Sequence, residues 1–218
     1  MSPGEPLIRW DWTIRHLPDI ALRLEQHLIL TGIAVGVGFA IALIVGIWAD
    51  RLPRLYGPVT WVAGVLYTIP SLALFALLIP WTGLSLLTAE IGLVSYTLLI
   101  LIRNVVAGLQ AVPPDVLDAA RGVGYTRWQI LWRVELPLAT AVILAGVRVA
   151  TITTIGLVTV TALIGQGGLG FFILQGIQQF FSTPLIIGAG LSVLLAVLVD
   201  ALLVQVERLA TPWARART

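Results

Sequence analysis

Long runs of apolar residues dominate this sequence, and short polar segments separate them. The runs are Leu28–Ala49, Val59–Ile79, Leu84–Ile102, Leu138–Ile164 and Leu185–Val206. Each is long enough to cross a hydrocarbon core of about 30 Å as an α-helix. They are continuous rather than alternating, and they are too long for the strands of a closed barrel, the other structure that satisfies backbone groups in lipid. The pattern therefore predicts an all-α integral membrane protein with five transmembrane helices.

The first 27 residues differ from these runs because charged residues interrupt their apolar pattern. One helical face of the segment is nevertheless apolar. It holds Ile14, Leu17, Ile20, Ala21 and Leu24. This face predicts a short interfacial helix on the outer surface, and an extension of the first membrane helix is the alternative. His16 and His27 are too far apart for one helical metal face, so we expect a surface role for both.

Composition indicates the same class of protein and excludes several functions. Hydrophobic residues make up 58% of the chain and charged residues 11%, far from the average of a soluble domain. Cysteine is absent and all 13 basic residues are arginine, so the chain has neither disulfides nor the lysine of a phosphate-binding P-loop. The basic residues lie where membrane topology favours them, which accounts for the net charge of +2. We therefore expect no nucleic-acid partner. No catalytic or metal-ligand pattern has plausible spacing, so no enzyme site, metal or cofactor is expected on this chain.

Arginines also indicate the orientation in the membrane, because they concentrate in cytoplasmic loops. With the N-terminus outside, most of them become cytoplasmic. These are Arg51, Arg54, Arg103, Arg121, Arg127, Arg133, Arg208, Arg215 and Arg217. The outer loops near Thr82 and Gln175 then carry no charge, while the arginines of the N-terminal tail alternate with acidic residues. This orientation predicts an external segment 1–27, a transmembrane domain 28–208 and a cytoplasmic tail 209–218.

The polar segment 113–137 predicts two short helices around a glycine hinge. Pro113 and Pro114 break the preceding helix and begin another, which Gly122 and Gly124 can end in a left-handed cap. Thr126 and Gln129 then have the spacing of a capping box.

Small and aromatic side chains of this segment suit a docking surface for a soluble partner. Ala119, Ala120 and Gly124 permit close approach of another backbone, while Trp128, Leu131 and Trp132 supply apolar anchors. The alternative is an amphipathic connector that rests on the membrane, and periodicity alone does not separate the two.

The spacing within the segment resembles the cytoplasmic signature of ABC importer permeases. That signature has acid-Ala-Ala, then Gly, then an aliphatic residue and Leu-Pro. The matching residues are Asp118, Ala119, Ala120, Gly124, Val134, Leu136 and Pro137, with Asp118 where Glu is usual. In this family the loop contacts the ATPase subunit. The resemblance therefore implies an ATPase-coupling surface at Asp118, Ala119, Ala120, Gly124, Trp128, Leu131, Leu136 and Pro137.

Other segments resemble the permeases that import osmoprotectants such as glycine betaine, choline and carnitine. They are residues 67–74, 103–104, 133–138, 145–148 and the glycine-rich stretch 162–170, in which Gln166 stands where a small residue is commoner. The likeness extends from about residue 24 to 208. It implies a type I permease of the bacterial inner membrane that acts with a second permease, identical or paralogous, with a cytoplasmic ATPase dimer that binds Mg-ATP, and with an external binding protein.

Several residues are candidates for the translocation pathway or its gate. They are Thr68, Pro70, Ser71, Asn104, Arg148, Gly165, Gly167 and Gly168. Pro70 permits a kink within an apolar run, and a purely structural kink is the alternative. The glycines predict a tight turn before a helix too short to span. Arg148 lies about 16 Å along its helix from the membrane boundary and needs a partner, for which we favour Asp200 over Glu90.

Two other functions stay open at this point. An ABC permease for another small polar solute, such as an amino acid, would share the docking signature. An ATP-independent channel or secondary transporter would also be mostly apolar, but the sequence lacks an obvious internal repeat and has few membrane carboxylates for ion coupling.

Overall fold

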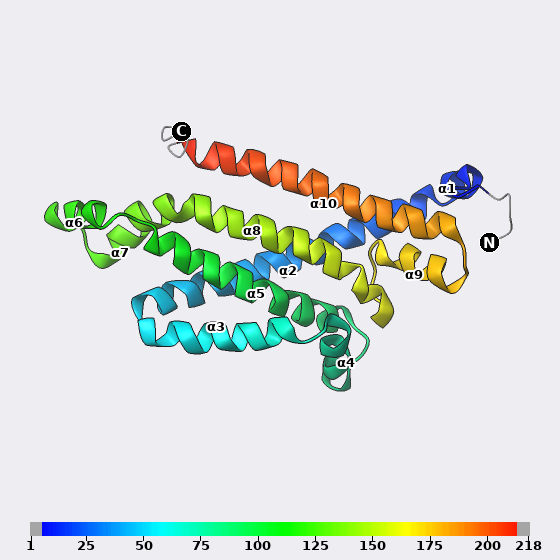
Figure 1. Ribbon diagram of the computed structural model, residues 1–218, viewed down its shortest axis with the longest axis horizontal. Helices are drawn as coiled ribbons and strands as arrows, with labels where there is room; N and C mark the ends of the chain where they lie inside the picture. The colour runs from blue at the N-terminus through cyan, green and yellow to red at the C-terminus, as the bar shows by residue number, and fades with distance from the viewer. Residues whose placement is uncertain (1–5, 213–218) are drawn as a thin grey trace. The chain divides into compact units, whose positions relative to one another are not determined.

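The computed structural model describes residues 6–212, and all regular structure within them is helical (Figure 1). The elements in chain order are α1 (Trp10–Arg15), α2 (Leu17–Arg51), α3 (Pro53–Thr68), α4 (Ser71–Thr82), α5 (Leu86–Gln110), α6 (Pro114–Gly122), α7 (Arg127–Ile130), the π-helix η1 (Leu131–Glu135), α8 (Leu136–Val158), the 3-10 helix η2 (Val160–Ile164), α9 (Gly170–Gln178) and α10 (Ser182–Ala210). The predicted all-α class is confirmed.

Four stretches of helix within the described residues are long and apolar enough to cross a membrane. They are α2, α5, the stretch Arg127–Val158 that ends in α8, and α10. Helices α3 and α4 pass the same test as a bent pair, which makes a fifth span by length and composition. Four of the five predicted spans are therefore confirmed, and the second corresponds to a helix pair bent by 98°, which is a broken span or a re-entrant loop.

Three predicted boundaries change. Helix α2 begins at Leu17, so residues 17–27 extend the first membrane helix, which was the alternative to a separate interfacial helix. Only α1 remains a separate helix. The last part of the run that ends at Ile164 is the 3-10 helix η2 rather than a continuation of α8. At the C-terminus, α10 includes Leu209 and Ala210, and the predicted tail from residue 213 onward lies outside the described residues.

The chain divides into two compact units, each built from segments distant in sequence. The first unit comprises 1–36, 69–94 and 151–199 as far as they are described, and the second comprises 37–68, 95–150 and 200–218. Helices α2, α5, α8 and α10 contribute residues to both.

In the first unit, α2, α4 and α5 share a core. It contains Leu30 and Ala34 of α2, Phe75 of α4 and Leu93 of α5. Gly92 lies against the Phe75 ring, which occupies the space that a Cβ atom would need. Small residues at such contacts allow close packing in lipid, where contact between side chains rather than exclusion of water holds helices together.

In the second unit, a core joins α5 to η1 and to the beginning of α8. Its fully buried members are Val105, Leu109, Leu131, Ala139 and Ile143. This core fixes the place at which the segment between α5 and α8 returns to the membrane helices.

Candidate functional site

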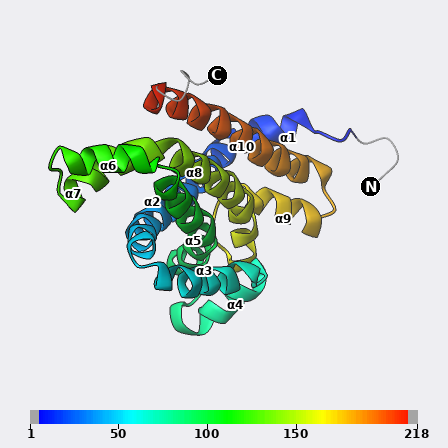
Figure 2. The ribbon, with the colours of Figure 1, turned by 60° about the vertical axis from the view of Figure 1, so that its left-hand side comes forward.

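The segment between α5 and α8 contains α6 and α7, which lie beside each other in both ribbon views (Figures 1 and 2). Helix α6 begins where the sequence predicts. Pro113 is extended and Pro114 occupies the first helical position, where the missing N–H would be unpaired in any case. Asp115 lies in the first turn, where a negative charge suits the helix dipole.

The end of α6 depends on one glycine. Gly124 has φ +88°, and its N–H donates to the carbonyl of Arg121 at 3.0 Å. The N–H of Tyr125 donates to the carbonyl of Ala120 at 3.1 Å, and these two bonds make a Schellman cap. The left-handed cap is confirmed at Gly124, whereas Gly122 is the last helical residue.

Helix α7 has the predicted capping box. The Thr126 hydroxyl accepts from the N–H of Gln129 at 3.4 Å, and the Gln129 side-chain oxygen accepts from the N–H of Thr126 at 2.8 Å. The chain then widens into the π-helix η1. Pro137 explains this widening, because it has no N–H for the carbonyl of Arg133 and its ring displaces that carbonyl from an α-helical position.

The side chains expected to dock a partner do not all face outward. Trp128 is 70% exposed and Ala119 is also exposed, whereas Ala120 is buried. Leu131 is only 2% exposed and belongs to the core with α5 and α8, so its expected role as a surface anchor is wrong. Leu136 packs against the same core. The exposed surface of the segment therefore centres on α6 and Trp128.

Sequence reasoning did not find the cavity beside Trp128. It has a volume of about 400 Å³ and lies between the end of α2 and the α7–η1 region. Its lining residues are Ile47, Trp48, Arg51, Leu52, Arg127, Trp128 and Leu131. Arg51 pairs with Glu135 of η1 across 84 residues of sequence, and the Glu135 side chain is only 7% exposed. This ion pair fixes η1 to the end of α2.

The predicted kink at Pro70 is a complete break. Helix α3 ends at Thr68 and α4 begins at Ser71, with Pro70 at the N-cap. The Thr68 hydroxyl donates to the carbonyl of Val65 at 2.8 Å, as expected for a side chain that satisfies a backbone group near the break.

Asn104 lies where α5 meets α8 in the second unit. Its amide donates to the carbonyl of Ile100 at 2.8 Å. Gly146 lies directly against it, because a Cβ atom at that position would be 2.6 Å from the Asn104 side-chain carbon Cγ. A larger residue at 146 would separate the two helices.

Arg148 has the expected partner and a second that was not expected. Its guanidinium lies 2.9 Å from the Asp200 carboxylate and 3.2 Å from the Glu207 carboxylate. The three side chains are 27–33% exposed. One guanidinium therefore contacts two carboxylates of α10. Helices α8 and α10 are thus joined by polar contacts within the second unit.

The glycine-rich segment after η2 is held by two residues of α2. Gly165 and Gly168 have φ values of +76° and +85°. Gln26 packs against Gly167, where the structure has no room for a Cβ atom, and its oxygen accepts from the N–H of Gly168 at 3.4 Å. The predicted tight turn is confirmed, and its position depends on α2.

His27 completes this contact and is not a surface residue. Its side chain is fully buried. Nδ1 accepts from the N–H of Leu169 at 3.2 Å, so the ring proton is on Nε2, which donates to the carbonyl of Ile155 at 3.0 Å. The expected surface role is wrong for His27, because both ring nitrogens bond to backbone groups inside the first unit.

Glu90 is a buried group that sequence reasoning considered only as a partner for Arg148. It is 9% exposed, and neither carboxylate oxygen has a hydrogen-bond partner within the described residues. The Thr31 hydroxyl is also buried without a partner there. An ionisable residue in a membrane span without a partner is a functional candidate.

No group of three or more His, Asp or Glu residues in 6–212 is placed to hold a metal ion.

Comparisons with known proteins give one consistent result. The family described as "Binding-protein-dependent transport system inner membrane component" matches residues 27–211. The osmoprotectant import permease protein OsmW of Salmonella typhimurium is 40% identical over 92% of this chain and 97% of its own length. The carnitine transport permease protein OpuCB of Listeria monocytogenes is 38% identical over 90% of both chains.

The fold has a solved counterpart. A chain of the MetNI methionine ABC transporter, in an inward-facing conformation, matches with a TM-score of 0.77 and 25% identity, over 85% of this chain and 93% of that one.

Proposed function

Because this chain belongs to the family of binding-protein-dependent transport system inner membrane components, we propose that it is the permease subunit of an ATP-driven importer of osmoprotectants. The substrate class is quaternary amines such as glycine betaine, carnitine and choline. The 40% and 38% identity, over about nine-tenths of this chain, to the osmoprotectant and carnitine permeases of Salmonella typhimurium and Listeria monocytogenes carries the proposal.

Two ATPase subunits supply the energy in this proposal, because the chain has no lysine for a P-loop. The docking surface is the exposed part of 113–137, with Asp118, Ala119, Gly124 and Trp128 at its centre. Asp118 pairs with Arg121 at 2.7 Å on the exposed face of α6. Leu131, Leu136 and Pro137 act indirectly by fixing this segment to the membrane helices.

A second permease subunit and an external binding protein complete the assembly. We place the N-terminus outside and the C-terminus in the cytoplasm, as the arginine distribution favours. The pathway candidates at the Pro70 break, Asn104, Arg148 and the 165–168 turn then face or support a route between two permeases.

Single-cysteine labelling tests the orientation, because the chain has no cysteine of its own. Leu84 and Val123 are 66% and 74% exposed, and they lie in opposite loops of the proposed topology. An impermeant maleimide added to intact cells should label Leu84→Cys and should label Val123→Cys only after permeabilisation. The reversed pattern would overturn both the orientation and the cytoplasmic docking surface.

Reconstitution with an ABC ATPase and an external binding protein from the same organism tests transport. Liposomes that contain all components should take up labelled glycine betaine, carnitine or choline only when ATP is enclosed. Labelled methionine serves as the comparison, because the matched transporter of known structure is named for it. Uptake of methionine in preference to all three quaternary amines would replace the substrate class, and uptake without ATP would overturn the importer proposal.

A further inference from the structure

A small cavity in the first unit has no place in the proposed function so far. It has a volume of about 300 Å³ and lies between the beginning of α2 and helix α9. Its lining residues are His16, Asp19, Leu22, Arg23, Phe171, Phe172 and Gln175. This volume is at the lower end for small-molecule sites, so it suits a compact ligand. We name it the α2–α9 cavity.

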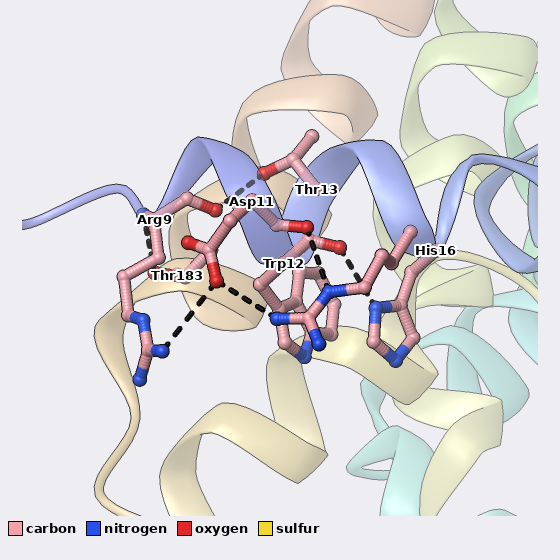
Figure 3. A network of polar contacts seen from close by, with 7 residues as sticks. Arg9, Asp11, Trp12, Thr13, His16 and Thr183 are labelled. Carbon is pink, nitrogen blue, oxygen red and sulfur yellow. Dashed lines mark hydrogen bonds and ion pairs between the residues drawn. The ribbon is translucent and has the colours of Figure 1, made fainter.

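Aromatic side chains make one wall of the cavity and hold one another in place. Phe172 is 2% exposed and packs edge-to-face against Trp12, with ring centres 6.0 Å apart. Trp12 stacks on His16 at 4.1 Å. Figure 3 shows the His16 ring beside Trp12, where Nδ1 donates to the Trp12 carbonyl at 2.8 Å. Phe171 and Phe172 meet at 5.6 Å. The wall is therefore fixed before any ligand arrives.

Two opposite charges line the same cavity without neutralising each other. Asp19 and Arg23 are four residues apart on α2, a spacing that brings side chains onto one face of a helix. Arg23 instead lies over the Phe171 ring at 4.0 Å and donates to the Gln26 oxygen at 3.1 Å. Within residues 6–212 the Asp19 carboxylate makes no ion pair or hydrogen bond.

The nearby pair Asp11 and Arg15 shows what the same spacing does elsewhere. These residues are also four apart, and they form an ion pair at 2.8 Å. Burial acts to raise the pKa of the Asp11 carboxyl, but Arg9 and Arg15 together with a backbone hydrogen bond outweigh it and lower that pKa below its usual value. In the cavity, by contrast, the aromatic ring and Gln26 draw Arg23 away from Asp19.

From this arrangement we infer that the α2–α9 cavity binds a small zwitterion that carries both a methylated ammonium and a carboxylate. Asp19 provides the negative charge that attracts the ammonium, which cannot donate hydrogen bonds. Arg23 bonds to the carboxylate as a charge-assisted donor. Asp19 would repel a ligand that is only an anion, and Arg23 would repel a ligand that is only a cation. The inference rests on the proposed function for its substrate class, and it favours glycine betaine and carnitine over choline.

Equilibrium binding to the permease–ATPase complex in nanodiscs, without the binding protein, tests the site. The ligand is labelled glycine betaine. The competitors are choline, which lacks the carboxylate, and 3,3-dimethylbutanoate, which has the shape of glycine betaine without the positive charge. Each competitor should bind at least about tenfold more weakly than glycine betaine, since one charged contact is lost. If the parent protein bound glycine betaine, choline and 3,3-dimethylbutanoate equally well, the inference would be overturned.

Charge-neutralising variants then locate the site. Asp19→Asn and Arg23→Gln should each weaken glycine betaine binding about tenfold or more, and Arg23→Gln should remove the preference over choline. Asp11→Asn and Arg15→Gln make the same changes in charge outside the cavity and should bind as the parent does. Unchanged binding in both cavity variants, or equal losses in the control pair, would overturn the site.

Uptake measured in the same preparation, after addition of the binding protein, separates the two proposals. Glycine betaine uptake without discriminating binding to the permease would overturn this inference and leave the proposed function standing. Discriminating binding that is lost in Asp19→Asn would support the site even if uptake of every osmoprotectant failed, and that failure would overturn the function.

Discussion

Replacing Gly124 by alanine isolates the energetic role of the cap that ends α6. The residue has φ +88°, and an added Cβ atom would have no neighbour within 4 Å. The cost of the substitution is therefore confined to the backbone, because an L-residue in the left-handed region is less stable by about 1–2 kcal/mol. The two hydrogen bonds of the Schellman cap require that conformation.

The neighbouring glycine provides a matched control. Gly122 is the last residue of α6, has no positive φ, and also has open space around its Cβ position. Alanine at 122 should stabilise the helix by about 0.5–1 kcal/mol. Asparagine at 124 should retain most of the parent's behaviour, because it tolerates the left-handed conformation better than alanine does.

Binding of the ATPase to the permease in nanodiscs measures the effect on coupling. A cost of one to two kcal/mol reduces the ratio of capped to uncapped segment by a factor of about 5–30, and the apparent Kd for the ATPase should rise by up to that factor in Gly124→Ala. Gly122→Ala should bind at least as tightly as the parent. Parent-level affinity and binding-protein-stimulated hydrolysis in Gly124→Ala would refute the reasoning, as would an equal loss in Gly122→Ala.

Three further predictions concern polar groups within the spans. Arg148→Leu should lower the free energy of unfolding, by less than the 3–5 kcal/mol typical of a fully buried pair, and adding Asp200→Asn should restore part of it in thermal unfolding. His27→Ala should destabilise the chain by about 1–3 kcal/mol and should speed hydrogen exchange at the Leu169 N–H, whereas unchanged exchange would contradict the contact. Glu90→Leu should raise the unfolding temperature of the isolated permease, because it removes a buried carboxyl without a partner; a lower temperature would show that the carboxyl is stabilised in the native protein.

Local signals made much of this fold predictable. The five spans follow from the length of apolar runs, and the segment between α5 and α8 follows from residues that act on their own neighbours. Pro114 begins α6, Gly124 ends it, and Thr126 caps α7. Each of these effects operates within a few residues, so no knowledge of the tertiary structure was needed.

The wrong side-chain placements have a common physical cause, since each depends on contacts between residues far apart in sequence. Leu131 looked like an anchor on a short amphipathic helix, but its burial depends on α5 and α8. His27 bonds to Ile155 across 128 residues, and Glu135 pairs with Arg51 across 84. A single sequence contains no signal for such pairs, and the docking role of 113–137 depends on a further chain.

These distant polar contacts also explain how largely apolar helices acquire a defined register. In lipid, an apolar helix gains little from contact with one apolar neighbour rather than another, so packing alone distinguishes poorly between positions along the helix axis. The Arg148 cluster joins α8 to α10, and the Arg51–Glu135 pair joins α2 to η1, both within the second unit. His27 and Gln26 join α2 to the glycine-rich segment within the first. A slip of one residue would separate these partners and leave charged or polar groups unpaired, so the register of each unit is specified by a few contacts, and the remaining apolar positions are free to vary in side-chain type.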